Sequence, residues 1–352
     1  MDRWKENPYG YSMHPFDYKM DLDDILSKVI ITDYRKSQYR KTFLNEFTIS
    51  TYNVWGVELF QFTFIDIRLP FIIDLLKKNR TDIVCLQEVG KKVLEALLDD
   101  PWIIANYYFS EVDVDWRNRG DVICLTLSRV QPMKTYIYTL KGGLFPSDLI
   151  YMEFEDRIII NTSLHPGSKN SPGISDCSNY SLCRIEQINI IGKIINKINT
   201  ANKIIYFGGD FNIDFNGCSE DWPEIDKILE LKMVDTWKLL KMGEHGFTED
   251  TLVNFMRWNT KQIEKQVRFD AILFTPHPSI NPLDINIFGN CKVYDLPFEM
   301  FLEKSKNLPI NSKKGFRTNG KIYYENDYPK TLDWYPSDHF GVLAKFEQRK
   351  SN

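Results

Sequence analysis

Short apolar runs separated by polar loops recur along the chain from Phe47 onward. They are rich in isoleucine, valine and aromatic residues, which is typical of β-strands packed into a sheet. None approaches the roughly 18 consecutive apolar residues that a membrane-spanning helix needs. The runs predicted as strands are residues 47–54, 82–89, 121–128, 149–155, 157–164, 203–211, 268–274 and 339–347.

Other stretches carry apolar residues at three- and four-residue spacing, which predicts amphipathic helices. The clearest is 181–198, where leucine and isoleucine residues share one face and Gly192 interrupts the pattern. Helices are also predicted over 68–78, 91–98 and 224–232. Strands and helices mixed in this order favour a layered α/β domain in which two sheets pack together.

Two segments depart from this pattern and define the predicted domain organisation. Residues 1–45 are polar, aromatic and irregular, and we interpret them as an N-terminal extension in which 21–31 has the spacing of a short amphipathic helix. The domain itself is predicted to span 46–348. Within it, 281–333 contains proline and lysine residues and has weak periodicity, so we interpret it as an insertion between two core strands.

The overall charge bears on the substrate. The formal net charge is −4, so no global basic field draws the protein onto nucleic acid. A polyanionic substrate would need a local basic patch or a metal ion. The six cysteines are scattered without zinc-ligand spacing, and the N-terminus lacks the apolar core of a signal peptide. These features predict an intracellular protein, in the cytoplasm or nucleus, with free thiols.

Acidic, amide and imidazole side chains stand at the ends of several predicted strands. Taken singly, such a residue is usually a turn or cap residue. Taken together, they suit the hydrolysis of a phosphate ester, because carboxylates hold a hard cation and a water while a histidine neutralises phosphoryl oxygens. The set comprises Asn53, Glu88, Asp210, Asn212, Asp270, Asp338 and His339.

The motifs Gly208-Gly209-Asp210-Phe211-Asn212 and Ser337-Asp338-His339 carry a family resemblance. With them, residues 47–347 resemble the endonuclease/exonuclease/phosphatase superfamily, the metal-dependent phosphodiesterases that include DNase I-like enzymes. The resemblance implies a four-layered α/β/β/α sandwich of two packed mixed sheets flanked by helices. Residues 248–254 (Thr-Glu-Asp-Thr-Leu-Val-Asn) further resemble the Thr-Trp-Asp-Thr-x-x-Asn of the tyrosyl-DNA phosphodiesterase 2 branch.

The resemblance implies a metal site built from oxygen ligands. Glu88 would be a metal ligand, and Asp338 would lie on the metal side. Asn53 would help to place water or phosphate. Mg²⁺ suits such ligands, with Mn²⁺ as a substitute, and a zinc site is disfavoured because no histidine or cysteine cluster is present.

The resemblance also implies the catalytic groups. Asp210 would orient or deprotonate the attacking water, and Asn212 would hold a phosphate oxygen. His339 would contact the phosphoryl group in the transition state, with Asp270 hydrogen-bonded behind it to keep the imidazole cationic. Asn254, which ends the branch motif, is assigned to substrate binding.

The chain departs from the family pattern at several points. Where relatives have Thr-His-Leu or Ser-His-Leu, this chain reads Ser163-Leu164-His165, and such a slip along a strand turns the side chain away unless a bulge corrects it. His165 is nevertheless carried as a substrate-binding candidate. Glu249 replaces a stacking tryptophan, which predicts weaker selectivity for single-stranded DNA ends. Arg184 matches an Arg-x-x-Gln of relatives and is a candidate for substrate binding, with a packing or surface role as the alternative.

The predicted activity is Mg²⁺-dependent hydrolysis of a phosphodiester by a metal-activated water. The leading substrate is a phosphotyrosyl or other nucleic-acid phosphodiester, so the expected partner is nucleic acid or a protein–nucleic acid adduct. The alternative with the same chemistry is a lipid or inositol phosphate headgroup, as in sphingomyelinase-like and phosphatase relatives. The alternative of another class is a catalytically inactive binding module, against which the presence of every expected acid argues.

Overall fold

The computed structural model describes residues 42–58, 63–112, 122–140, 147–167, 178–199, 203–254, 256, 265–304, 316–318, 321–323 and 329–349. The helix expected over 21–31 and nearly all of the N-terminal extension therefore lie outside the described residues. No helix in the described ranges is long and apolar enough to cross a membrane.

The first sheet is mixed, with the strand order β13-β18-β1-β2-β4-β3. β1 runs parallel to β2 and antiparallel to β18, so the chain's first and last core strands lie side by side. The strands are β1 (Glu46–Asn53), β2 (Ile83–Val89), β3 (Tyr108–Phe109), β4 (Ile123–Ser128), β13 (Ile280–Phe288) and β18 (Gly341–Gln348).

The second sheet is also mixed, with the order β5-β6-β7-β8-β12-β9. β7 and β8 are parallel, and β12 returns antiparallel to β8. The strands are β5 (Lys134–Leu140), β6 (Ser147–Glu153), β7 (Arg157–Ser163), β8 (Ile204–Asp210), β9 (Val234–Asp235) and β12 (Asp270–Phe274).

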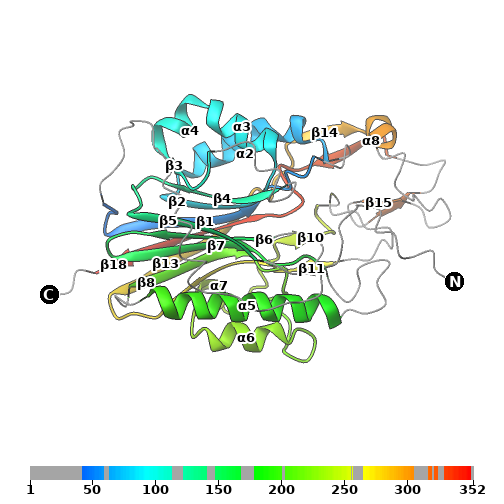
Figure 1. Ribbon diagram of the computed structural model, residues 1–352. Helices are drawn as coiled ribbons and strands as arrows, with labels where there is room; N and C mark the ends of the chain where they lie inside the picture. Colours follow the sequence, from blue (N-terminus) through cyan, green and yellow to red (C-terminus); the bar gives the residue numbers. More distant parts are fainter. Residues whose placement is uncertain are drawn as a thin grey trace, which may run out of the picture.

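Helices cover the outer faces of the two sheets, as Figure 1 shows. α2 (Ile65–Asn79), α3 (Lys91–Asp99) and α4 (Pro101–Asn106) pack on the first sheet, and α5 (Ser178–Ile198) and α6 (Glu224–Glu230) pack on the second. The short helix α7 (Thr236–Leu240) follows β9. The layers are thus helix, sheet, sheet and helix, which confirms the expected four-layered sandwich.

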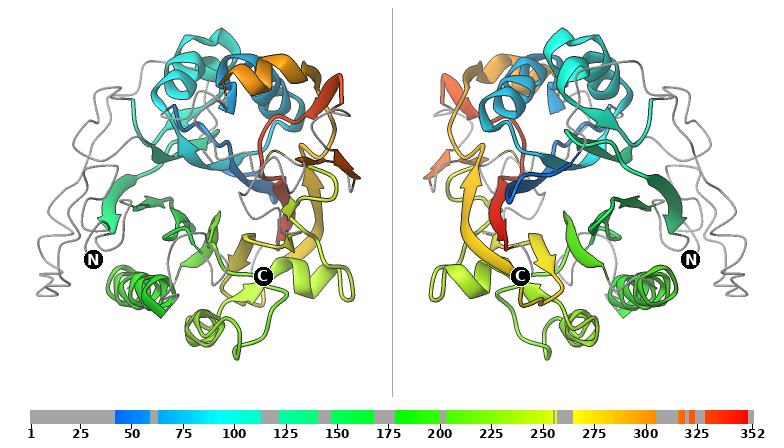
Figure 2. Two further views of the ribbon diagram at one scale, coloured as in Figure 1. Left: turned by 90° about the vertical axis from the view of Figure 1, so that its right-hand side faces the viewer. Right: turned by 90° about the vertical axis from the view of Figure 1, so that its left-hand side faces the viewer.

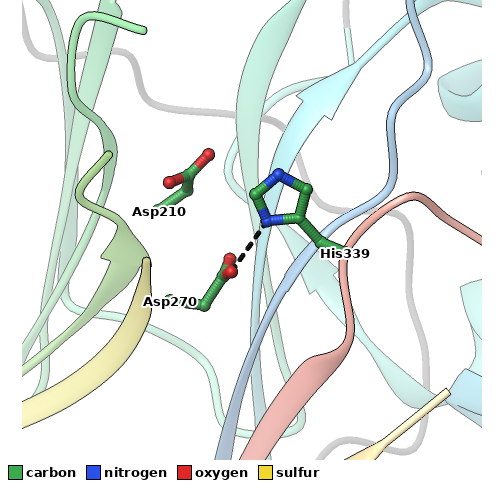
Figure 3. A group of neighbouring side chains, drawn as sticks. All are labelled: Asp210, Asp270 and His339. Carbon is green, nitrogen blue, oxygen red and sulfur yellow. Dashed lines mark hydrogen bonds and ion pairs between the residues drawn. The ribbon is translucent and has the colours of Figure 1, made fainter. Parts of the chain in front are cut away.

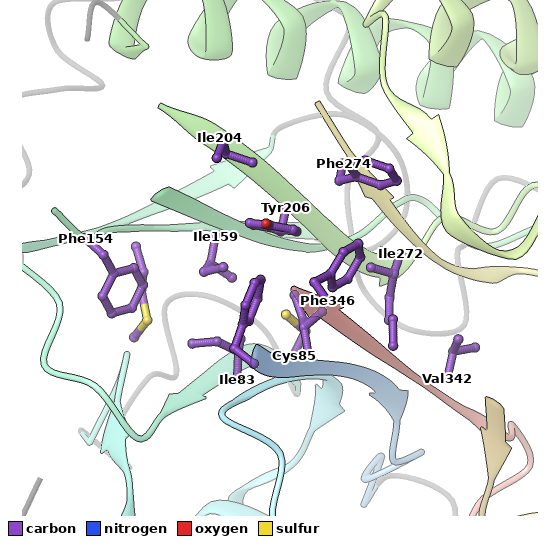
Figure 4. Close-up of a cluster of buried hydrophobic side chains, with 14 of the residues drawn as sticks. Ile83, Cys85, Phe154, Ile159, Ile204, Tyr206, Ile272, Phe274, Val342 and Phe346 are labelled. Carbon is purple, nitrogen blue, oxygen red and sulfur yellow. The ribbon is translucent and has the colours of Figure 1, made fainter. Parts of the chain in front are cut away.

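The central core fills the space between the sheets. Phe47 and Phe346 from the first sheet meet Tyr206 and Phe274 from the second, and all four side chains are buried. Figure 4 labels Phe346, Tyr206 and Phe274 of this cluster. The alternation of these inward residues with outward ones is the period-two pattern that predicted the strands. Each of the eight predicted strands and four predicted helices corresponds to an observed element, with ends shifted by up to three residues.

The region interpreted as an insertion needs correction. β13 lies inside it, yet this strand pairs with β18 along the edge of the first sheet and is therefore part of the core. The sequence pattern did not predict this strand, because it lacks a regular apolar alternation. Pro282 and Asp284 flank a shift of register, and much of this edge strand is exposed or half-buried.

Smaller elements lie apart from the two sheets at one end of the sandwich, on the right in Figure 1, the end that faces the viewer in the left view of Figure 2. Three two-stranded sheets and α8 (Phe298–Lys304) are present in the described residues. Leu296, Phe301 and Trp334 join a fourth apolar cluster with Trp55, which follows β1. The pairs are β10 (Glu249–Asp250) with β11 (Gln266–Val267), β14 (Tyr294–Pro297) with β17 (Thr331–Trp334), and β15 (Phe316–Thr318) with β16 (Lys321–Tyr323).

Candidate active site

The candidate site lies at one rim of the sandwich, where ends of strands from both sheets meet. Asn53 is the last residue of β1, and Asp210 is the last residue of β8. Asp270 begins β12 and stands directly opposite Asp210 in the antiparallel register. His339 lies two residues before β18, which runs antiparallel to β1. Strand direction and register therefore gather side chains that are far apart in sequence.

His339 and Asp270 form a buried pair at the centre of the site. Nδ1 of His339 lies 2.8 Å from Oδ2 of Asp270 (Figure 3). Burial opposes the charged imidazolium, but the Asp270 carboxylate and other nearby acids outweigh it and raise the pKa of His339 well above its usual range. Because Nδ1 faces Asp270, Nε2 is the nitrogen that can donate to a phosphoryl oxygen. The predicted pairing of these two residues is present.

Asp210 is a buried carboxylate with an elevated pKa. Burial, followed by repulsion from Asp270, raises the pKa of Asp210 to about 7, although the positive His339 acts in the opposite direction. Its oxygens accept hydrogen bonds from Nδ2 of Asn53 at 3.0 Å and from the backbone N–H of Asn212 at 2.9 Å. A carboxylate with a pKa near neutrality is suited to accepting a proton from water.

Asn53 connects the acids of the two sheets. Its Nδ2 donates to Oε1 of Glu88 at 3.0 Å and to Oδ2 of Asp210 at 3.0 Å. Its Oδ1 accepts from the backbone N–H of Trp55, which fixes the orientation of the amide. The side chain is fully buried, so the structure places Asn53 as a bridge between the predicted metal ligand and the predicted base.

Glu88 occupies an unusual backbone conformation. Its φ is 51°, in the left-handed region, and the register between β2 and β4 shifts across it, between Leu86 and Val89. A bulge of this kind re-aims a side chain, and a strained conformation at a functional position is held by its surroundings. Here Gly56 donates its N–H to the carbonyl of Glu88 at 2.8 Å, and a Cβ on Gly56 would lie only 2.6 Å from that oxygen.

The residues before β18 are tied to the end of β1. The Ser337 hydroxyl donates to the carbonyl of Asn53 at 2.7 Å, and it lies 3.3 Å from Oδ1 of Asp338. Asp338 is buried beside His339. The donor set predicted for a metal, Glu88 and Asp338, consists of carboxylates and fits Mg²⁺ or Mn²⁺ better than zinc.

A second set of possible ligand atoms also lies in the described part of the chain. Oxygen or nitrogen atoms of Asp210, Asp270 and His339 fall within 4.8 Å of one another. The Asp270 carboxylate raises the pKa of His339 and so favours the charged imidazolium, whereas an imidazole ligates a metal only in its neutral form. We therefore interpret this trio as the acid–base centre of the site, with Glu88 and Asp338 left as the metal candidates.

Asn212 and Asn254, the other two amide residues predicted for the site, both donate hydrogen bonds to backbone carbonyls. Asn212 has φ of 52°, a conformation that asparagine tolerates, and its Nδ2 donates to the carbonyl of Leu164 at 2.9 Å. Asn254 is buried, and its Nδ2 donates to the carbonyl of Ser337 at 2.7 Å. Asn254 therefore holds the loop that carries His339. Direct contact of either amide with substrate stays a prediction.

Arg184 and His165 lie in a buried cluster between α5 and the loop after β7. The Arg184 guanidinium forms an ion pair with Glu224 at 2.6 Å and donates to the carbonyls of His165 and Gly167. The imidazole of His165 stacks on Tyr180, and burial lowers its pKa to about 4. These contacts agree with the packing alternative for Arg184. Substrate binding by the two residues stays a prediction.

The position of Glu249 corrects the interpretation of the branch motif. The side chain is fully buried and forms an ion pair with Nζ of Lys265 at 2.5 Å. It therefore does not occupy a surface on which a base would stack. The weaker selectivity for single-stranded DNA ends stays a prediction.

Thr248 is a site residue to which sequence reasoning assigned no role. Its hydroxyl accepts the backbone N–H groups of Phe269 and Asp270 at 3.0 and 3.1 Å. Its carbonyl accepts the N–H of Phe340 at 2.7 Å, so one threonine links the strands that carry the buried pair. The sequence signal that could have identified Thr248 is its place at the start of the motif of residues 248–254.

One protein-family model matches the chain, described as the Endonuclease/Exonuclease/phosphatase family and covering residues 50–258. The candidate site residues Asn53, Glu88 and Asp210 fall within this range, whereas Asp270 and His339 lie beyond it. No curated protein sequence matches the chain.

Solved structures with the same fold include two TDP2 proteins and a phosphatase. D. rerio TDP2 complexed with a single-strand DNA product superposes with a TM-score of 0.58 at 17% identity, covering 86% of this chain and 99% of that one. TDP2 from C. elegans gives 0.58 at 17%, covering 86% and 75%. A mannosyl-6-phosphatase from Bacteroides thetaiotaomicron gives 0.55 at 14%, covering 85% and 99%. At sequence identities this low, the superpositions establish a shared fold and nothing further.

Proposed function

The chain belongs to the endonuclease/exonuclease/phosphatase family of phosphoester hydrolases, and from this premise we propose that it is a divalent-metal-dependent phosphodiesterase. The observation that carries the proposal is the bridge from Glu88 through Asn53 to Asp210, set against the buried pair of Asp270 and His339. One side of the site concentrates acids, and the other presents a cation. This division suits the attack of water on a phosphodiester.

The residues of this chain supply the proton transfer and the charge stabilisation. Asp210, with a pKa of about 7, accepts a proton from the attacking water. His339 is kept cationic by Asp270 and donates from Nε2 to a phosphoryl oxygen, where negative charge grows in the transition state. Asn53 holds the base in place through its amide.

Glu88 and Asp338 would hold the metal, because Asp270 is paired with His339 and Asp210 is assigned the role of base. A bound Mg²⁺ or Mn²⁺ supplies positive charge that polarises the phosphoryl group and lowers the pKa of water. With a net charge of −4, the protein needs such local charge to accept an anionic substrate.

The leading substrate class is a phosphotyrosyl or other nucleic-acid phosphodiester, and an intracellular role in DNA repair would follow from it. The shared fold with a TDP2 bound to a single-strand DNA product supports this choice, together with Thr248, Asp250, Thr251 and Asn254 of the motif. A phosphorylated headgroup or sugar is the second candidate, favoured by the mannosyl-6-phosphatase of the same fold.

A substrate panel tests the proposal. The full chain is assayed with 5′-tyrosyl DNA, abasic DNA, RNA, sphingomyelin and mannose 6-phosphate, each with Mg²⁺ and with EDTA. We expect hydrolysis of at least one nucleic-acid substrate with Mg²⁺ and none with EDTA. Full turnover in metal-free buffer contradicts the metal dependence. Exclusive turnover of sphingomyelin or the sugar phosphate selects the second candidate, and inactivity on the whole panel favours a binding module.

A further inference from the structure

Arg68 is a fully buried arginine whose described hydrogen bonds all end on main-chain carbonyls. It lies on the first turn of α2, and its guanidinium donates to Thr63 at 2.7 Å, Val54 at 2.9 Å, Trp55 at 2.6 Å and Pro336 at 2.7 Å. Burying a charged group without ionic compensation is costly, so an arginine held in this way needs a reason.

The carbonyls that Arg68 binds belong to the loops that carry the site. Val54 and Trp55 directly follow Asn53, whereas Pro336 precedes Asp338 by two positions. Arg68 and Pro336 are 268 positions apart in the chain. A single guanidinium thus joins the loop after β1 to the loop before β18. The planar fork of arginine makes this possible, because it presents several donors in fixed directions.

The charge of Arg68 also falls where the rim is most acidic. Burial lowers its pKa to about 10, which leaves it cationic at neutral pH, and the charges of Asp338 and Glu88 act against that shift. The positive charge of Arg68 in turn attracts these carboxylates and offsets part of the repulsion between them. Arg68 is thus linked to both predicted metal ligands by charge, and by hydrogen bonds to the loop after Asn53 and the loop before Asp338.

We propose that Arg68 is a positioning residue for the hydrolytic site, which locks the loop after Asn53 against the Asp338–His339 loop and sets a fixed positive charge behind the metal-binding carboxylates. The inference rests on the proposed phosphodiesterase function for its kinetic consequences. Its structural part, the joining of two loops, stands independently of the substrate.

The test compares Arg68→Lys with Arg157→Lys. Lysine keeps the charge but cannot fork between two loops. Arg157 is an equally buried arginine at the start of β7, away from the rim, where it contacts Asp156, Gln348 and the ring of Phe43. Both substitutions are expected to lower the stability of the protein. The Arg157→Lys control therefore separates a loss of activity caused by unfolding from one caused by misplaced loops at the site.

Hydrolysis of bis(p-nitrophenyl) phosphate with Mn²⁺, and amide hydrogen exchange of peptides spanning 53–56 and 336–340, are measured for both variants. Arg68→Lys should lower kcat by roughly tenfold to a hundredfold with little change in KM, since a small misplacement of catalytic groups has effects of this size. It should raise the Mn²⁺ concentration for half-maximal rate and speed exchange in both peptides together. Arg157→Lys should leave all of these at wild-type values.

Wild-type kcat, Mn²⁺ requirement and exchange in Arg68→Lys would overturn the inference. If the wild type hydrolyses nothing, the proposed function fails, while the exchange data still decide whether Arg68 joins the loops. If Arg68→Lys does not fold, Ser337→Ala removes the other tie between the same loops, the hydroxyl bond to Asn53. Faster exchange in both peptides would then support the coupling of the loops, and unchanged exchange would overturn it.

Discussion

Nδ1 of His339 lies 2.8 Å from Oδ2 of Asp270, although 69 positions separate the two residues in the chain. Both are buried, so solvent screens their attraction little. The pair connects the start of β12 in one sheet with the approach to β18 in the other. The raised pKa of the imidazole depends on this contact between sheets, and so does the role proposed for His339 in stabilising a phosphoryl transition state.

Replacing Asp270 by Asn should lower the pKa of His339, because the carboxylate that favours the imidazolium is removed. The rate should fall by roughly 10²-fold to 10⁴-fold, as for other acid–base groups. The basic limb of the kcat profile should move to lower pH, because His339 then loses its proton earlier. NMR titration of the His339 ring and the pH–rate profile measure both effects, and unchanged curves would show that the pair does not control this charge.

Replacing Asp210 by Asn should remove activity and change the pH dependence of stability. The pKa of Asp210 is raised from 3.8 to about 7, so between these values the folded state keeps a proton that the unfolded state releases. Wild-type stability therefore decreases as pH rises through this window, and the variant lacks this contribution. Urea unfolding in metal-free buffer at about pH 4 and pH 8 tests the sign. A stability difference between the proteins that is constant with pH would contradict the raised pKa.

Replacing Glu88 by Gln keeps the side-chain volume but removes one charge at the proposed metal position. We expect a folded protein with activity lower by about 10²-fold or more and a higher Mg²⁺ requirement, because carboxylates are the preferred anchors of this ion. Glu95→Gln, on the exposed surface of α3, is the matched control. Equal Mg²⁺ titrations for the two variants would exclude Glu88 as a ligand.

Replacing Glu249 by Trp should destabilise the protein and give no gain in DNA binding. The substitution leaves Lys265 without its buried partner and forces an indole into a fully buried position. Losing one member of a buried pair costs about 3–5 kcal/mol, and the partial exposure of Lys265 places the expected loss near the lower end. Urea unfolding and fluorescence anisotropy with single-stranded DNA are the measurements. A stable variant with tighter binding would mean that position 249 faces the substrate.

Replacing Gly56 by Ala should lower activity through Glu88. A Cβ at Gly56 would lie 2.6 Å from the carbonyl oxygen of Glu88 and 2.6 Å from the N of Gly90. Neither backbone atom can yield without moving the bulge, so we expect a kcat lower by roughly tenfold or more. Gly192→Ala in α5 is the control, since its Cβ would meet only a flexible leucine side chain and alanine favours helix. Equal kcat values for the two variants would show that Gly56 does not set the bulge.

Most strands, the main helices and the set of candidate acids were predictable from the amino-acid sequence. These features are local: side-chain alternation marks a strand, a recurrence of 3.6 residues marks a helix, and polar residues next to glycine mark strand ends. β13 was not predicted, because its edge position and Pro282 leave it without a regular apolar pattern. Such a strand is evident only from its pairing with β18, and the sequence of the segment alone does not show this pairing.

Which of these residues lie together is a property of the three-dimensional fold. It placed Asp270 against His339 and Asn53 between Glu88 and Asp210, and it buried Glu249 in an ion pair with Lys265. It also revealed Arg68, which the sequence shows only as a charged residue within an amphipathic helix. Burial, partner and pKa depend on atoms brought together from distant parts of the chain, and a one-dimensional pattern does not contain that information.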